Sequence, residues 1–280
     1  MKFGMNLLLW TTHVSAEHFP LLARLKETGF DGVEVPLFQG DEAHYKRIGQ
    51  ELKKLGLGCT TVTCCGPDNN PVSPDTAVRK KASEHHKWAI AMTAAMGGTH
   101  MAGPYHSALG VFTGAGPTDD EKKRAVEVLR LAADEAKKHG VMLALEYLNR
   151  FECYLVTTAV DSRTLVKQVN HPSCRMMYDT FHANIEEKDI SQAIVGAADS
   201  IVHVHISEND RGTPGTGHVH WKETFAALKQ IKYDGWLTIE AFGRALPDLA
   251  AATKVWRDLF PAAEEVCTKG LQFMKSMWKN

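Results

Sequence analysis

The sequence lacks the features that mark secreted, membrane-spanning and nucleic-acid-binding proteins. Its six cysteines form no C-x-x-C motif, and we interpret them as reduced thiols of a cytoplasmic protein. No apolar run approaches the roughly 20 residues of a transmembrane helix, and we expect no signal peptide because no cleavage site is found. A net charge of −1 gives no basic surface for nucleic acid or an anionic membrane, so small neutral ligands are the favoured partners.

Glycine-rich phosphate-binding motifs are also missing. The segment after the first predicted strand, residues 11–14, has no G-x-G-x-x-G fingerprint, which disfavours an open doubly wound sheet that binds a dinucleotide. A later segment, Arg211-Gly-Thr-Pro-Gly-Thr-Gly-His218, contains glycines but lacks the Gly-Lys-Ser/Thr of a P-loop. The sequence therefore indicates neither of these nucleotide-binding arrangements.

Short apolar segments alternate with longer amphipathic segments along all 280 residues. The composition, 44% hydrophobic and 23% charged, is that of an ordinary globular protein. Eight strand–helix units can close into a barrel of about 250 residues. We therefore predict an α/β fold, a single (β/α)8 TIM barrel domain over residues 1–280 with an extended C-terminal helical segment. The predicted strands are residues 2–10, 32–36, 57–63, 100–104, 142–148, 174–179, 201–207 and 236–242.

Helix boundaries are marked most clearly between Thr118 and Gly140. Thr118 and Glu121 have the spacing of a capping box, an apolar stripe follows, and basic residues precede Gly140. An earlier helix is predicted to begin at Ser73, with a proline in the first helical position. A later helix is predicted to end at Asn170, shortly before another proline. These signals support the alternation of strands and helices.

Four polar side chains stand where the last four predicted strands end. Glu146, Asp179, His205 and Glu240 are 33, 26 and 35 residues apart, so each step is one strand–helix repeat. Because side chains alternate along a strand, all four are expected to share the inward face while their immediate neighbours face the helices. Active sites of such barrels lie at the carboxyl ends of the strands. We therefore expect the four side chains to converge in the barrel mouth.

A divalent cation would account for this convergence. Carboxylates and an imidazole that converge without partners cost several kcal/mol each, and no Lys or Arg lies on the same strand faces. The oxygen-rich set suits Mn²⁺ or Mg²⁺ best, while Co²⁺ and Zn²⁺ are also compatible. His203 shares a face with His205 but lies deeper, so we assign it to the packed layer below the predicted metal site.

Three further polar residues follow the predicted ligands in the loops after the strands. Glu152, His182 and Arg211 come six, three and six residues after the nearest predicted ligand. Each one alone would be interpreted as a solvent-exposed loop residue. Their closeness to the ligand strands favours a second interpretation, in which they donate and accept hydrogen bonds to the oxygens of a polyol.

Together these motifs resemble the D-tagatose/D-allulose (psicose) 3-epimerase family of the xylose isomerase-like barrels, over nearly the whole chain. The motifs are Glu146, Asp179-Thr-Phe-His182, His205-Ile-Ser-Glu-Asn-Asp-Arg211 and Ile239-Glu240-Ala-Phe. The resemblance implies a Mn²⁺-type site formed by Glu146, Asp179, His205 and Glu240. It also implies that Glu146 and Glu240 are the catalytic pair, and that Glu152, His182 and Arg211 bind the ketose around its first two oxygens.

The implied reaction is inversion of carbon 3 in a free ketose such as D-tagatose, D-fructose, D-allulose or L-ribulose. One base removes the proton, a cis-enediolate is stabilised, and a second group returns a proton to the other face. Glu146 and Glu240 are three strands apart, which would place them on different sides of a bound ligand. A metal chelated by the ketone oxygen and the neighbouring hydroxyl would stabilise the developing charge.

Other functions remain open from the sequence. Another sugar isomerase or a dehydratase, of the hydroxypyruvate or inosose type, would use the same metal frame. A metal-dependent AP endonuclease has the same barrel and Asp-x-x-His, but it needs a basic groove and more ligands from early strands, where the second strand offers Glu34. A non-catalytic sugar-binding barrel is disfavoured by the two glutamates that can flank a substrate.

Two expectations concern regions outside the predicted metal site. The far end of the sugar is expected to meet the ends of the first four strands, where the candidates are Trp10, Cys65, Tyr105 and His106. The C-terminal helices carry more apolar surface than one barrel needs. We predict that part of it packs on the barrel bottom and part on another subunit, in the homodimer or homotetramer that the resemblance suggests.

Overall fold

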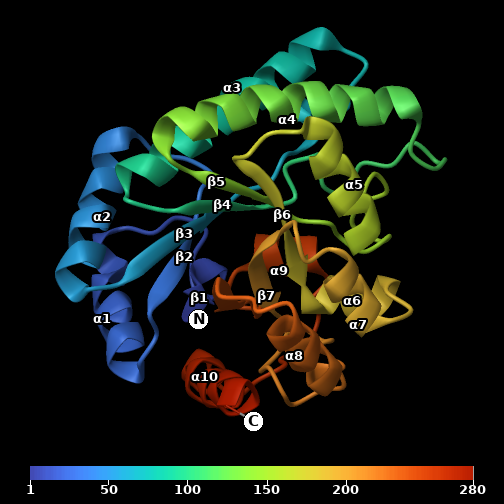
Figure 1. Cartoon of the computed structure of the whole chain (residues 1–280). Coiled ribbons are helices and arrows are strands. Elements are labelled where there is room, and N and C mark those ends of the chain that lie inside the picture. The colour runs from blue at the N-terminus through green and yellow to red at the C-terminus, as the bar shows by residue number, and fades with distance from the viewer. Residues whose placement is uncertain (280) are drawn as a thin grey trace.

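Eight parallel strands form a closed barrel, in which each strand pairs with the next and β8 returns to β1 (Figure 1). The structure is a computed structural model that describes residues 1–279. It confirms the predicted (β/α)8 fold. The strands are β1 (Lys2–Asn6), β2 (Gly32–Pro36), β3 (Gly58–Val62), β4 (His100–Gly103), β5 (Met142–Leu145), β6 (Cys174–Asp179), β7 (Ile201–Ile206) and β8 (Trp236–Ile239).

The helices surround the barrel on its outer side, except for α9, which lies over one end of it (Figure 1). They are α1 (Phe19–Thr28), α2 (Glu42–Leu55), α3 (Thr76–Ala95), α4 (Asp119–His139), α5 (Ala159–Val169), α6 (Thr180–Glu186), α7 (Ile190–Gly196), α8 (Trp221–Gln230), α9 (Pro247–Thr253) and α10 (Ala263–Lys279). Within residues 1–279, none of these helices combines the length and the apolar character that crossing a membrane requires.

Local capping explains where the helices begin and end. The Thr118 side chain accepts a hydrogen bond from the backbone N–H of Glu121, and α4 ends at Gly140 in the left-handed conformation, as predicted. α5 ends as predicted at Asn170. The predicted start of α3 is wrong. Its N-cap is Asp75 rather than Ser73, because the Asp75 carboxylate accepts from the N–H at the start of the helix.

Several strands end earlier than their apolar runs predict. β1 ends at Asn6 rather than Trp10, because the Asn6 side chain accepts a hydrogen bond of 2.9 Å from the backbone N–H of Leu8. This contact turns the chain into the 3-10 segment η1 (Leu7–Leu9). β5 and β8 likewise end one residue before Glu146 and Glu240. The apolar run continues into the buried turn, so the length of the run overestimates the length of the strand.

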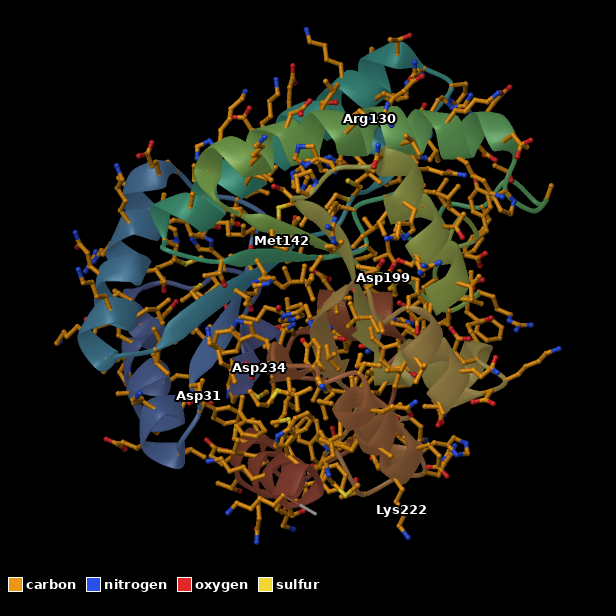
Figure 2. The ribbon with its side chains drawn as sticks, viewed as in Figure 1. Asp31, Arg130, Met142, Asp199, Lys222 and Asp234 are labelled. Atoms are coloured by element: carbon orange, nitrogen blue, oxygen red, sulfur yellow. The ribbon has the colours of Figure 1, made fainter. Side chains whose placement is uncertain are left out.

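Side-chain alternation divides the apolar core into an outer and an inner part. Tyr178 and Val204 belong to the large cluster between the strands and the helices, a space that side chains fill (Figure 2). Ala144 and Met177 belong to a small cluster inside the barrel, together with Ala102. The predicted inward and outward faces of these strands are therefore confirmed, and the inward face leads directly to the barrel mouth.

The last helix, α10, closes the outer ring between α8 and α1 (Figure 1). It packs against the flank of β8 and β1, and a Cβ atom at Gly270 would lie 2.8 Å from Cδ1 of Ile239. Glycine therefore permits the close approach. Leu271 and Met274 are buried in the same wall. The prediction that this apolar surface packs on the barrel bottom is wrong, because α10 serves as the eighth helix of the ring.

Candidate active site

The structure brings the four predicted ligand side chains together at the carboxyl ends of the last four strands. Asp179 ends β6, His205 lies in β7 opposite it, and Glu146 and Glu240 directly follow β5 and β8. One ligand atom from each residue lies within 4.8 Å of all the others, and all four residues are buried. Regular strand pairing thus places residues far apart in the sequence around one point.

Nδ1 of His205 faces all three carboxylates. It lies 3.3 Å from Oε1 of Glu240, 3.6 Å from Oδ2 of Asp179 and 3.7 Å from Oε1 of Glu146. Among residues 1–279, neither this nitrogen nor Oδ2 of Asp179 has a hydrogen-bond partner. Buried polar atoms without partners are rare because each costs desolvation free energy. Their convergence fits the donor set of a divalent cation.

The electrostatics of the cluster show the same need for positive charge. Burial, together with the charges of Glu240 and Asp179 and against the opposing effect of His205, raises the pKa of Glu146 to about 8. Although burial disfavours its charged form, the negative charges of Glu34 and Glu240 raise the pKa of His205 well above its usual value. The protein alone therefore balances its carboxylates by holding protons, which a cation would displace.

A second layer of polar side chains lies below the four. His203 is fully buried there, as predicted, and its Nε2 is 2.9 Å from Oε2 of Glu34. Glu34, from β2, also contacts Nε2 of His205 at 2.6 Å and accepts hydrogen bonds from Asn6 and Thr60. From the sequence, Glu34 was considered only as a further metal ligand. The sequence feature that could have indicated the role of Glu34 is a glutamate on the inward face of an otherwise apolar strand.

His182 lies beside the four side chains and also lines the cavity. Both ring nitrogens of His182 face hydrogen-bond donors, because the backbone N–H of Asn149 donates to Nδ1 at 3.0 Å and Nη2 of Arg211 lies 3.1 Å from Nε2. Nε2 lies 3.8 Å from Oε1 of Glu146. Burial lowers the pKa of His182 to about 4, which keeps the ring neutral at physiological pH. Glu152, on the preceding loop, accepts a 2.8 Å hydrogen bond from the Asn149 side chain.

The guanidinium of Arg211 reaches the cluster from the loop after β7. Its Nη1 donates to Oε2 of Glu240 at 2.7 Å and lies 3.6 Å from Oδ2 of Asp179. The group lies 3.7 Å above the ring of Phe181, which holds its plane in place. Arg211 therefore supplies part of the positive charge that the strand faces themselves lack.

The loop that carries Arg211 is organised by a buried carboxylate that the sequence did not reveal. Glu208 is 0% exposed. It accepts hydrogen bonds from the backbone N–H groups of Asn209, Gly215 and Val219 and from Nε1 of Trp221. These bonds fold the glycine-containing segment back on itself, and Arg211 takes a φ of 68°. The loop is therefore a preorganised support for the guanidinium.

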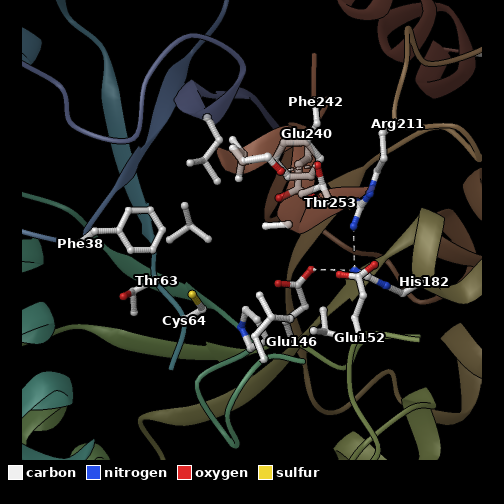
Figure 3. Close-up of a pocket in the computed structure, with 17 residues that line it drawn as sticks. Phe38, Thr63, Cys64, Glu146, Glu152, His182, Arg211, Glu240, Phe242 and Thr253 are labelled. Atoms are coloured by element: carbon white, nitrogen blue, oxygen red, sulfur yellow. Dashed lines mark hydrogen bonds and ion pairs between the residues drawn. The ribbon is translucent and has the colours of Figure 1, made fainter. Parts of the chain in front are cut away.

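The site opens into a cavity with a charged side and an apolar side (Figure 3). Glu146, Glu152, His182, Arg211 and Glu240 form the charged side. Apolar side chains, α9 among their sources, line the other side and include Leu8, Phe38, Val62, Leu109, Leu148 and Leu249. The structure therefore brings all seven predicted site residues together. Five of them line the cavity, and Asp179 and His205 converge with Glu146 and Glu240 without lining it.

The candidates for the far end of a sugar lie elsewhere. Cys65, Tyr105 and His106 are fully buried, and Trp10 packs against the core. None of the four, all within the described chain, lines the cavity. The sequence neighbours Cys64 and Pro104 do line it, because adjacent residues near a strand end face opposite sides. This part of the sequence prediction is wrong, and α9 was not considered at all.

Comparison with known proteins identifies the family. Residues 22–277 match the family described as Xylose isomerase-like TIM barrel. The chain is 31% identical to the L-ribulose 3-epimerase of Methylomonas sp. strain DH-1, with 99% of this chain and 98% of that protein covered.

Two solved structures are similar along the whole chain. One is a D-allulose 3-epimerase from Methylomonas sp. in complex with D-allulose, with 29% identity, a TM-score of 0.93, and 99% and 97% of the two chains covered. The other is a D-psicose 3-epimerase from Clostridium cellulolyticum H10 with D-tagatose, with 29% identity, a TM-score of 0.92 and 99% of each chain covered. The chain thus belongs to the xylose isomerase-like TIM barrel family and, within it, to the ketose 3-epimerases, which are isomerases.

Proposed function

We propose that the protein is a metal-dependent enzyme that inverts carbon 3 of free ketoses. One observation carries the proposal. The ligand atoms of Glu146, Asp179, His205 and Glu240 converge within 4.8 Å, and two of these residues, Glu146 and Glu240, also line the cavity. The same residues can therefore hold a cation and reach a substrate. The ketose 3-epimerases among the similar proteins support the same reaction.

The four converging residues would hold the cation. Three carboxylates and one imidazole suit Mn²⁺ best, with Mg²⁺ and Co²⁺ as alternatives. When bound, the cation would polarise the carbonyl of the substrate and stabilise negative charge on its oxygens. The partnerless Nδ1 of His205 and Oδ2 of Asp179 support this assignment.

Glu146 and Glu240 are the proposed acid–base pair. They follow β5 and β8 and line different walls of the cavity (Figure 3). A carboxylate on one face takes the proton from carbon 3, which leaves an enediolate, and a carboxylic acid on the other face gives a proton to the same carbon. Two groups are needed because inversion requires the proton to leave one face and arrive at the opposite one.

Three side chains on the charged side would orient the ketose. His182 presents its Nε2 to the sugar, and the Arg211 guanidinium donates through nitrogens next to Glu240. Glu152 accepts hydrogen bonds from sugar hydroxyls. All three line the cavity beside the proposed catalytic pair, which favours contact with the first two oxygens of the sugar.

Label incorporation in deuterated water tests the reaction. Protein supplied with Mn²⁺ is incubated with D-fructose, D-allulose, D-tagatose and L-ribulose, and the products and the labelled carbon are identified by NMR. We expect pairs of ketoses that carry deuterium at carbon 3. An aldose product with little label would indicate a hydride-shift isomerase instead, and dehydration or no reaction would also contradict the proposal.

Substitution of the proposed pair tests the roles of the individual residues. Glu146→Gln and Glu240→Gln are each expected to abolish measurable turnover, with kcat at least about 10²-fold lower, because an amide cannot transfer the proton. Glu84→Gln removes a carboxylate whose side chain is 62% exposed on α3, and it serves as the matched control. Near-normal activity in either site variant, with folding checked by circular dichroism, would remove that residue from the mechanism.

We also propose that the protein assembles as a homodimer or homotetramer in the cytoplasm. Phe151 and Trp256 are 73% and 69% exposed, which supports a further protein contact. All six cysteines, each within the described chain, are free thiols, as a reducing compartment permits. Sedimentation equilibrium at micromolar concentration measures the assembly, and a monomer would reject it.

A further inference from the structure

Glu34 occupies the centre of the barrel directly beneath the proposed metal site and is completely buried. Its Oε1 lies 2.6 Å from Nε2 of His205 and accepts a 3.0 Å hydrogen bond from Nδ2 of Asn6. Its Oε2 accepts a 3.0 Å hydrogen bond from Thr60 and lies 2.9 Å from Nε2 of His203. Oε1 is therefore held by two hydrogen bonds and Oε2 by one, with His203 as a second close neighbour of Oε2.

The contact with Glu34 determines which nitrogen of His205 is available above it. Because a carboxylate only accepts hydrogen bonds, the nitrogen at 2.6 Å, Nε2, carries a proton. The remaining nitrogen, Nδ1, is the one that faces Glu146, Asp179 and Glu240. A histidine ligand is held in this way when its second nitrogen donates to a carboxylate, which fixes the tautomer and the ring orientation.

Asn6 extends the same control to a second ligand. Its Oδ1 accepts from the backbone N–H of Leu8, so its Nδ2 group must point the other way. Nδ2 then donates to Oε1 of Glu34 at 3.0 Å and to Oε1 of Glu240 at 3.3 Å. The β1–β2 register, which pairs Asn6 with Glu34, sets this bridge. One buried carboxylate thus connects with two of the four proposed ligands.

We infer that Glu34 is a positioning residue for the metal centre, whose carboxylate holds Nδ1 of His205 toward the cation and, through Asn6, orients Glu240. The inference rests on the proposed metal-dependent function and deepens it. The negative charge of Glu34 also makes the imidazole a stronger electron donor. Loss of such an outer partner typically weakens metal affinity about 10- to 100-fold.

A second cation between Glu34, His203 and His205 is the alternative, because their ligand atoms also lie close together. The contacts argue against it. Both oxygens of Glu34 already accept hydrogen bonds, and none of these three side chains lines the cavity, whereas Glu146 and Glu240 of the proposed site do. A stoichiometry of two Mn²⁺ per chain would support this alternative and overturn the inference.

The test compares Glu34→Gln with Thr60→Val. Glutamine keeps the shape of Glu34 but removes its charge. Valine removes the hydrogen bond to the other oxygen, Oε2, from a residue equally buried in the same layer, and it leaves the contact with His205 intact. Mn²⁺ affinity is measured by electron paramagnetic resonance of the free ion. We expect the Kd to rise about 10- to 100-fold in Glu34→Gln and less than threefold in Thr60→Val.

The ring proton of His205 gives a readout that a purely structural role would not change. In Zn²⁺-loaded protein with ¹⁵N-labelled histidine, we expect Nδ1 to be metal-bound and the Nε2 proton to resonate far downfield and exchange slowly. In Glu34→Gln this proton should shift upfield and exchange faster, whereas Thr60→Val should match the wild type.

The possible failures are distinguishable. Equal Mn²⁺ affinities and an unchanged Nε2 proton in Glu34→Gln would overturn the inference while the proposed function stands. Absence of Mn²⁺ binding by the wild-type chain would overturn the proposed function and, with it, the role of Glu34. Equal loss of affinity in Thr60→Val would assign the effect to general packing and would also overturn the inference.

Discussion

Residues of the site share their hydrogen-bonding atoms, so a single substitution changes more than one contact. Glu240 is the clearest case, because Oε1 faces His205 while Oε2 accepts from Nη1 of Arg211. Nη1 of Arg211 also donates to Ser207, and Nη2 lies 3.1 Å from Nε2 of His182. The planar guanidinium therefore makes several contacts in fixed directions, which a lysine ammonium cannot reproduce.

Arg211→Lys is predicted to lower kcat/KM about 10- to 100-fold, because a hydrogen bond to a charged group contributes about 1.5–3 kcal/mol. The measurement is steady-state epimerisation of a ketose at saturating Mn²⁺. Arg257→Lys is the matched control, since the Arg257 side chain is 73% exposed and its contact with Asp210 is long, at 3.9 Å. Equal kinetic constants for both variants would show that the geometry of the guanidinium is unimportant.

At the scale of elements, a helix boundary was predictable where the sequence offers one capping residue. It was not predictable where two residues can both cap the helix. α4 follows the predicted capping box and C-terminal glycine. α3 illustrates the failure. Both Ser73 and Asp75 can cap a helix, and in the structure the Ser73 hydroxyl accepts from the Asp75 N–H in a turn that precedes the helix. The sequence shows two residues that can cap the helix, but it does not show which of them does.

The α4 cap makes a stability prediction. Thr118→Ala removes the acceptor for the N–H of Glu121 and should lower the free energy of unfolding by about 1 kcal/mol. Urea unfolding monitored by circular dichroism measures the change. Thr268→Ala, an exposed substitution inside α10, is the control and should leave stability unchanged or slightly higher. An equal loss in both variants would contradict the capping argument.

Contacts across the barrel limited what the sequence could predict about the site. The convergence of the four proposed ligands was predictable because each lies at the carboxyl end of its own strand at the same depth, a pattern of period and spacing. Asn6 and Glu34 were not assigned, because their roles depend on closure of the barrel, which pairs β1 with β8 and brings Glu34 of β2 to His205 of β7. The cavity wall formed by α9 was missed for the same reason, since no local pattern indicates where that helix packs.

At the scale of the whole molecule, the proposed cation should link the second half of the barrel and stabilise the fold. Mn²⁺ at 100 times its Kd is predicted to raise the free energy of unfolding by about 2.7 kcal/mol, because only the folded chain assembles the site. Thermal unfolding with Mn²⁺ and with a chelator measures the difference in Tm.

Asp179→Asn is the control for this cation effect. Asparagine can still cap α6, where Asp179 now accepts from the N–H of His182 at 2.9 Å, but it lacks the charge that favours a cation. The difference in Tm between the two conditions should therefore be smaller in this variant. An equal Mn²⁺ effect in the wild type and in Asp179→Asn would locate the bound cation elsewhere.

Buried neutral histidines should make the whole fold sensitive to mild acid. Burial lowers the pKa of His86 to about 3 and that of His106 to about 4. In the unfolded chain both rings titrate near about 6.5. Between these values the unfolded chain binds more protons than the folded one, so the stability present above pH 6.5 is lost as the pH falls. At pH 5 the loss is about 2 kcal/mol for each of the two histidines.

His86→Gln separates this effect from the titration of carboxylates. Urea unfolding of the chelator-treated protein is measured between pH 7 and pH 5, and stability is plotted against pH. The slope should be smaller in His86→Gln by up to about 1.4 kcal/mol per pH unit, because one buried ring no longer takes up a proton on unfolding. His220→Gln replaces an exposed histidine and should leave the slope unchanged. Parallel curves for the wild type and His86→Gln would show that burial of His86 does not make the fold acid-sensitive.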